Sequence, residues 1–263
     1  MDRGPRLWHL RAVLLRCIEA CVYSSLWLAA AAAALTAAAG QALAACAEPR
    51  CMWIAACGTL VVYNVDRLRD MTRDRVTAPE RTAFVEAWRS GLVALSALAA
   101  LVAGVLALGL DTRAALLLAP ILALGLLHRR LKHAAYLKSM YVTGAWLAVV
   151  VGLPWSTAPQ ASQPGWVLAC VGSAILANAI ASNLRDAEAG AARIGATRAL
   201  AIARSVAVLG IATALLAPPE ARGLAALPGA MLVVLLRFRP TERYGLFQVD
   251  GALLVGALLA LVL

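Results

Sequence analysis

The chain has 263 residues, of which 62% are hydrophobic and only 14% are charged, and its mean hydropathy is +0.79. Soluble domains carry about 25% charged residues, so one water-soluble core is excluded and an integral membrane protein is predicted. The formal net charge of +10 raises the alternative of nucleic-acid binding. However, the arginines lie in separate segments with no binding module between them. We therefore expect a lipid bilayer, and no nucleic acid, as a partner.

Apolar stretches that approach the 17–25 residues needed for a membrane-spanning helix recur along the whole sequence. They predict an all-α membrane protein with a single polytopic domain over residues 1–263. The nine predicted spans are 18–38, 50–65, 91–110, 113–128, 139–156, 165–182, 197–217, 222–236 and 246–263. The second and eighth spans are short, so we expect their helices to continue into polar ends.

Basic residues gather on alternate sides of these spans. Of the 24 lysines and arginines, 21 precede the first span or lie around the even-numbered connections; the other three are Arg50, Arg113 and Arg222. The positive-inside rule then predicts a cytoplasmic N-terminus. Nine spans put the C-terminus outside, and the bacterial inner membrane is the expected location.

The polar end of the second span reads VYNVDRLRDMTRDRVTAPER over residues 62–81. If the helix continues there, Asp66, Asp70 and Asp74 share one face, because residues four apart are neighbours on a helix. One interpretation is a solvated helix end with Asp–Arg pairs, each worth about a few tenths of a kcal/mol. The other is a carboxylate site for Mg²⁺, which prefers oxygen ligands.

A second polar patch follows the sixth span, in the sequence NAIASNLRDAEAG. Asn183 and Asp186 are three residues apart and share a helix face, and Glu188 is close by. On the predicted topology this patch and the acids of the second span lie on the same side of the membrane. A basic segment between them adds three cations that suit phosphate oxygens: Arg130, Lys132 and Lys138.

The first patch resembles a motif of the UbiA superfamily of intramembrane prenyltransferases. Members of that superfamily have nine transmembrane helices and two Asp-rich motifs, on the cytoplasmic connections after helices two and six. The first motif is Asn-x-x-x-Asp-x-x-x-Asp with an Arg seven residues later. Asp66, Asp70, Asp74 and Arg81 fall on that spacing, with Asp66 in the Asn place.

The second patch is similar to the second family motif, in its form NDIRDxExD. The sequence SNLRDAEAG fits that frame and retains Arg185, Asp186 and Glu188. Asn183 and Gly190 stand where the family has acids. The resemblance covers nearly the whole chain, although the second motif is degenerate.

The resemblance implies Mg²⁺-dependent transfer of an isoprenyl group from a prenyl diphosphate to a small acceptor, often an aromatic ring, in an apolar cavity among the helices. The metal ligands that it implies are Asp66, Asp70, Asp74, Asn183, Asp186 and Glu188, of which Asp66, Asp70 and Asp186 are the expected catalytic residues. The candidate diphosphate contacts are Arg73, Arg81, Arg130, Lys132 and Lys138. The candidates for the prenyl or acceptor cavity are Tyr63 and Tyr141.

Three other functions stay open from the sequence. The degenerate second motif also fits a UbiA-like protein that has lost or changed its catalysis. A transporter requires an ionisable path across the membrane, but nearly all the acids gather at one predicted surface. A membrane scaffold without catalysis is the third alternative.

Overall fold

The structure, a computed structural model, describes residues 4–44, 48–118, 121, 138–157, 163–187 and 193–263. All regular elements in these ranges are helices, and the same ranges contain no strand. Seven of the described helical segments are long and apolar enough to cross a membrane. The chain is therefore an all-helical integral membrane protein, as its composition predicts.

The first half of the chain contains α1 (Gly4–Tyr23), α2 (Leu26–Ala44), α3 (Pro49–Thr77), α4 (Pro79–Ala87) and α5 (Arg89–Ala107). Residues 112–118 begin another helix. The next span is continuous and consists of α7 (Lys138–Leu147), the π-helix η1 (Ala148–Gly152) and α8 (Leu153–Thr157). The last elements are α9 (Pro164–Arg185), α11 (Ala196–Leu216), α12 (Pro219–Arg222), the 3₁₀ turn η2 (Gly223–Ala225), α13 (Ala226–Leu236), the π-helix η3 (Tyr244–Val249) and α14 (Asp250–Val262).

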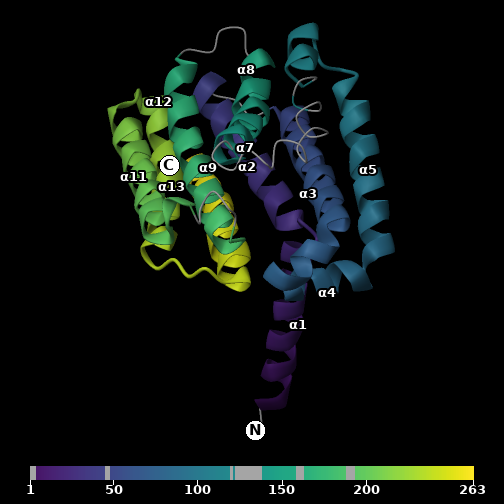
Figure 1. Ribbon diagram of the computed structural model, residues 1–263. Coiled ribbons are helices and arrows are strands. Elements are labelled where there is room, and N and C mark those ends of the chain that lie inside the picture. Colours follow the sequence, from purple (N-terminus) through teal and green to yellow (C-terminus); the bar gives the residue numbers. More distant parts are fainter. Residues whose placement is uncertain (1–3, 45–47, 119–120, 122–137, 158–162, 188–192) are drawn as a thin grey trace.

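The seven apolar segments correspond to seven of the nine predicted spans. The predicted span 50–65 lies in α3, which is not among the seven because its polar half lowers its hydropathy. It still packs between α2 and α5, inside the bundle (Figure 1). Most of the predicted span 113–128 lies outside the described residues. The expected polar extension of the second span is confirmed, since α3 continues without interruption for 29 residues.

The first predicted span, 18–38, is wrong in its position, because the chain breaks between α1 and α2. Ser25 adopts the left-handed conformation with φ 66°, which is uncommon for residues other than glycine. Its hydroxyl donates a hydrogen bond of 2.8 Å to Oδ1 of Asn64, and Arg67 donates one of 2.6 Å to the carbonyl of Tyr23. Arg67 thus pairs a backbone carbonyl at the interruption, and Ser25 ties the break to α3. The apolar span covers Leu26–Leu43 instead.

The alanine-rich α2 lies at the centre of the bundle and packs against α3, α9 and α14. Its alanines Ala31, Ala32 and Ala39 have no exposed surface. Small side chains let helices approach closely in lipid, where the hydrophobic effect between helices is weak. The alanine-rich sequence therefore gives α2 a surface against which the neighbouring helices can pack closely.

Several polar connections meet at one end of the bundle, which we call the polar end. In Figure 1, α4 and the connection between α13 and η3 lie at this end, while α8 and α12 lie at the opposite end. The N-terminal half of α1 projects from the polar end. Arg243 joins Glu19 of α1 and Glu80 of α4 by hydrogen bonds of 2.9 and 2.7 Å. The expected grouping of the N-terminal segment with the second and eighth connections is thus confirmed.

Candidate functional site

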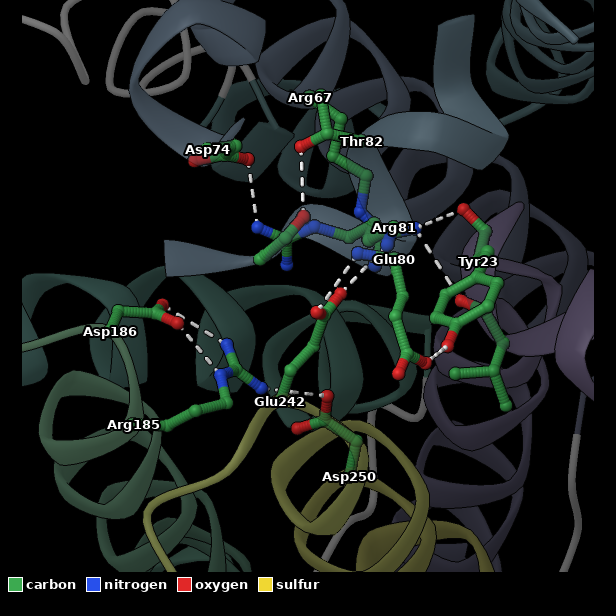
Figure 2. Close-up of polar contacts among 12 residues, drawn as sticks. Tyr23, Arg67, Asp74, Glu80, Arg81, Thr82, Arg185, Asp186, Glu242 and Asp250 are labelled. Carbon is green, nitrogen blue, oxygen red and sulfur yellow. Dashed lines mark hydrogen bonds and ion pairs between the residues drawn. The ribbon is translucent and has the colours of Figure 1, made fainter. Parts of the chain in front are cut away.

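The acids of the first motif lie on the last turns of α3. Asp66, Asp70 and Asp74 are all half-buried on this one helix. The chain then turns at Ala78, and Pro79 starts α4 at the first helical position, where proline is well tolerated. The turn brings Arg81 back onto α3, so that its Nη2 donates to Oδ2 of Asp74 at 2.7 Å (Figure 2).

Arg81 is largely buried, and its Nε has no hydrogen-bond partner among the described residues. Its position depends on the other end of the chain. The carboxylate of Glu242 accepts hydrogen bonds from the backbone N–H groups of Glu80 and Arg81, at 3.2 and 2.8 Å. These are two of the unpaired N–H groups at the start of α4, where a negative charge is also favoured. Glu242 therefore caps α4 and fixes the approach of Arg81 to Asp74.

Arg67 is another buried cation of the polar end, and the sequence prediction missed it. Its Nη1 contacts the carbonyls of Val22 and Tyr23 at the end of α1. Burial first, and then the charge of nearby Arg81, lower the pKa of this guanidinium to about 9, whereas Asp250 acts in the opposite direction. Arg67, Arg81 and Asp250 therefore lie in one electrostatic environment.

The second motif ends α9 and forms a buried ion-pair network. The Nε and Nη2 atoms of Arg185 donate to the two carboxylate oxygens of Asp186, at 2.7 and 3.0 Å. On its other side, Nη1 of Arg185 lies 3.6 Å from Oδ2 of Asp250, the first residue of α14 (Figure 2). Oδ1 of Asp250 accepts a hydrogen bond of 3.1 Å from Asn178. Arg185 therefore lies between two carboxylates.

The two motifs meet at the polar end. Burial opposes ionisation of Asp186, but its contacts with Arg185 and the charges of Arg81 and Lys138 outweigh burial, so the pKa of Asp186 is lowered. Arg81 belongs to α4 and Lys138 begins α7. Side chains from both predicted patches and from the basic segment thus act on one carboxylate.

The other predicted residues surround this cluster. Asn183 donates from its Nδ2 to Ser139 at 2.7 Å, so its amide oxygen is the atom suited to a cation. Tyr63 accepts a hydrogen bond of 3.2 Å from the indole of Trp146, and its ring lies edge-on to that indole. It is also within electrostatic reach of Arg185 and Asp250. Tyr141 is half-buried on α7, three residues after Lys138.

Four predicted residues cannot be placed in this way. Glu188, Arg130 and Lys132 lie outside the described residues, as does the side chain of Arg73.

The remaining donors fit Mg²⁺ in their chemistry, because carboxylate and amide oxygens are the ligands this ion prefers. Within the described ranges, however, no three acidic, histidine or cysteine side chains form a group ready to hold a metal. Asp74 and Asp186 contact arginines instead. Mg²⁺ usually binds one or two carboxylates together with waters and substrate phosphates, so a complete protein cage is not required.

Two of the hollows lined by described residues lie away from the polar cluster. One, of about 330 Å³, is an apolar groove lined by residues of α7, α9 and α11, such as Leu147, Gly172 and Gly210. The other, of about 260 Å³, is lined by Gln163, Trp166 and Glu220, among others. The central substrate cavity therefore stays a prediction.

The sequence contained one signal that pointed to the missed acid. Asp250 lies inside the predicted span 246–263, and an ionisable residue within a span is a functional candidate by default. Asn178, which is polar but not ionisable, lies inside the sixth predicted span. In contrast, Arg67 and Glu242 are ordinary in sequence, since each lies in a polar segment rich in charges.

Comparisons with known protein families, curated proteins and solved structures find no match for this chain.

Proposed function

We propose that the chain is a Mg²⁺-dependent intramembrane prenyltransferase, which moves an isoprenyl group from a prenyl diphosphate to a small lipophilic or aromatic acceptor. The observation that carries the proposal is the meeting of the two polar motifs. Asp186, which follows α9, is acted on by Arg81 of α4 and Lys138 of α7, at one end of an apolar helical bundle. Buried acids and cations at one end of an apolar bundle suit a substrate that has a charged head group and an apolar tail.

In this proposal the acids of α3 and the end of α9 hold the cation, as the sequence resemblance implies. The metal ligands are Asp66, Asp70, Asp74, Asn183, Asp186 and Glu188. The diphosphate contacts are Arg73, Arg81, Arg130, Lys132 and Lys138. When bound, Mg²⁺ neutralises negative charge that develops on the departing diphosphate.

The other side chains hold and orient the substrates. Charge-assisted hydrogen bonds from Arg81 and Lys138 would fix the diphosphate at the polar end. Tyr63, buttressed by Trp146, and Tyr141 would border the apolar part of the substrate next to the polar cluster. Exclusion of water by these aromatic and aliphatic groups protects a reactive isoprenyl cation from hydrolysis.

The test is release of pyrophosphate from prenyl diphosphates of several lengths by the purified protein in lipid nanodiscs, with Mg²⁺ and a panel of aromatic acceptors. Asp70→Ala and Asp186→Ala should each lower the rate by more than about 100-fold. Even substitutions of residues that only orient a metal ligand lower metal affinity or activity about 10–100-fold. The control is Glu86→Gln, at an exposed ion pair with Arg75, which should retain the wild-type rate. Full activity in both alanine variants would contradict the proposal.

The second candidate is a UbiA-like protein with lost or altered catalysis. The pairing of Asp74 and Asp186 with arginines, and the lack of a three-acid group among the described residues, favour it. Saturable binding of a prenyl diphosphate without release of pyrophosphate, for every acceptor tried, would support this candidate instead.

For the location we propose the bacterial inner membrane, with the polar end in the cytoplasm. This orientation follows from the distribution of basic residues. A cysteine introduced at exposed Thr241 should react with a membrane-impermeant thiol reagent only in inverted vesicles, in a background without the native cysteines.

A further inference from the structure

The geometry of Arg185 leaves one of its nitrogens without a hydrogen bond. Nε and Nη2 are both engaged by Asp186. Nη1 is buried and has no hydrogen-bond partner among the described residues. A buried donor without a partner is destabilising. This nitrogen faces Oδ2 of Asp250 at 3.6 Å, which is beyond a normal hydrogen bond.

Asp250 is held so that one oxygen faces Arg185. The side chain of Asn178 donates from Nδ2 both to Oδ1 of Asp250 and to the carbonyl of Val249, each at 3.1 Å. This double contact fixes the Asp250 carboxylate against α9. Oδ2 is then the oxygen directed at the guanidinium, as Figure 2 shows.

Gly245 makes this approach possible. It lies in the π-helix η3, directly before α14, and a Cβ at this position would overlap Cδ of Arg185. π-Helical turns occur often at functional sites. The glycine lets the start of the last span come within reach of a side chain at the end of α9.

We propose that Asp250 is a positioning residue that offers Arg185 a second buried carboxylate, so that Asp186 can turn to a divalent cation. The inference rests on the proposed function, because it takes Asp186 as a ligand of that cation. A carboxylate that binds a cation must loosen its hydrogen bonds to arginine. A buried arginine left without a carboxylate partner is strongly destabilising, whereas a shift of about 0.7 Å brings Nη1 to hydrogen-bond distance from Asp250.

The test is a titration of the full-length protein in detergent with Mn²⁺, followed by electron paramagnetic resonance, without a prenyl substrate. Asp250→Asn has the same shape and keeps an oxygen for Asn178. It should weaken Mn²⁺ binding about tenfold or more, the usual effect of residues that orient a metal ligand. The control is Glu220→Gln, which removes an exposed acid of α12, at the opposite end of the bundle. This variant should bind Mn²⁺ as wild type does.

Gly245→Ala separates positioning from simple charge attraction, because it retains every charge but pushes Arg185 away from Asp250. It should also weaken Mn²⁺ binding, while Gly229→Ala, where a Cβ meets nothing within 4 Å, should not. If Gly245→Ala does not fold, Asn178→Ala takes its place, since it removes the hydrogen bond that orients Asp250. Thermal unfolding and gel filtration check that each variant is folded.

Three results would overturn the inference. The first is that Asp250→Asn binds Mn²⁺ within twofold of wild type. The second is that Asp250→Asn binds Mn²⁺ more weakly while Gly245→Ala, or Asn178→Ala in its place, binds it as wild type does. The third is that the wild-type protein does not bind Mn²⁺. The last result leaves the proposed function standing, because the phosphates of a prenyl substrate also supply ligands to the cation. If Mn²⁺ binds and the variants behave as expected, but no pyrophosphate is released, only the proposed function is contradicted.

Discussion

The two polar patches of the site are built in different ways. Asp66, Asp70 and Asp74 come from one helix, and the partner of Asp74, Arg81, follows only seven residues later. The other patch joins the end of α9 to the start of α14, with Asn178 and Asp250 72 residues apart. The ion pair of the first patch joins residues that are close in sequence. The pair of Arg185 with Asp250 exists only in the folded bundle and is the more deeply buried of the two, which predicts that breaking it is more costly.

The largest expected effect is that of Arg185→Gln. The side chains of Arg185 and Asp250 are only 9% and 8% exposed, so the substitution leaves the Asp250 carboxylate without its cation and with little water to replace it. Removing one partner of a buried ion pair costs about 3–5 kcal/mol. We expect a loss of that size in the free energy of unfolding, measured by titration with SDS in mixed micelles. Arg75→Gln, at a pair that is 67% and 41% exposed, should change it by less than about 1 kcal/mol.

Arg81→Gln should have a smaller effect on the same measurement. Asp74 is 18% exposed and lies beside the turn into α4, so water can replace part of the lost contact. Hydrogen bonds to charged groups contribute about 1.5–3 kcal/mol, and we expect a loss at the lower end of that range. A loss equal to that of Arg185→Gln would show that the local patch is as tightly coupled to the fold as the tertiary one.

Glu242→Ala tests whether the local patch is positioned from a distance. The variant removes the cap of α4, and lost caps cost about 1 kcal/mol. Amide hydrogen exchange at Glu80 and Arg81 should become faster, because their N–H groups lose the Glu242 carboxylate. Exchange within α11 serves as the internal control. Unchanged protection of both amides would contradict the capping role.

The smallest effect is expected from pH. The pKa of Asp186 is lower in the folded protein than its usual value, so its stabilising contribution is present above the pKa of the unfolded chain. It is lost as the pH falls through the folded pKa. The unfolding free energy should therefore not change through Asp186 between about pH 8 and pH 5, and its contribution should decline below about pH 4. Asp186→Asn should reduce that acid-side decline. An identical decline in wild type and variant would mean that other carboxylates cause it.

Much of the architecture was predictable because a membrane span requires a long stretch of apolar residues, which is visible in the sequence. Seven apolar segments match predicted spans, and the acids four residues apart do lie on one continuous helix. The break at Ser25 was not predictable, since the buried hydrogen bond that accompanies it reaches Asn64 on another helix. The count of nine spans depends on α3, whose polar half keeps it out of the seven apolar segments, and on residues that the structure does not describe.

The sequence by itself determined the membrane class, the helical spans and the spacing of the first acids, because these follow from local hydropathy and helical periodicity. Only the tertiary structure decided which charges meet. It placed Asp250 and Gly245 against Arg185, and Glu242 against the start of α4. The physical reason is that a buried charge needs a partner of opposite sign within a few ångströms, and packing of distant helices, not distance along the chain, supplies it.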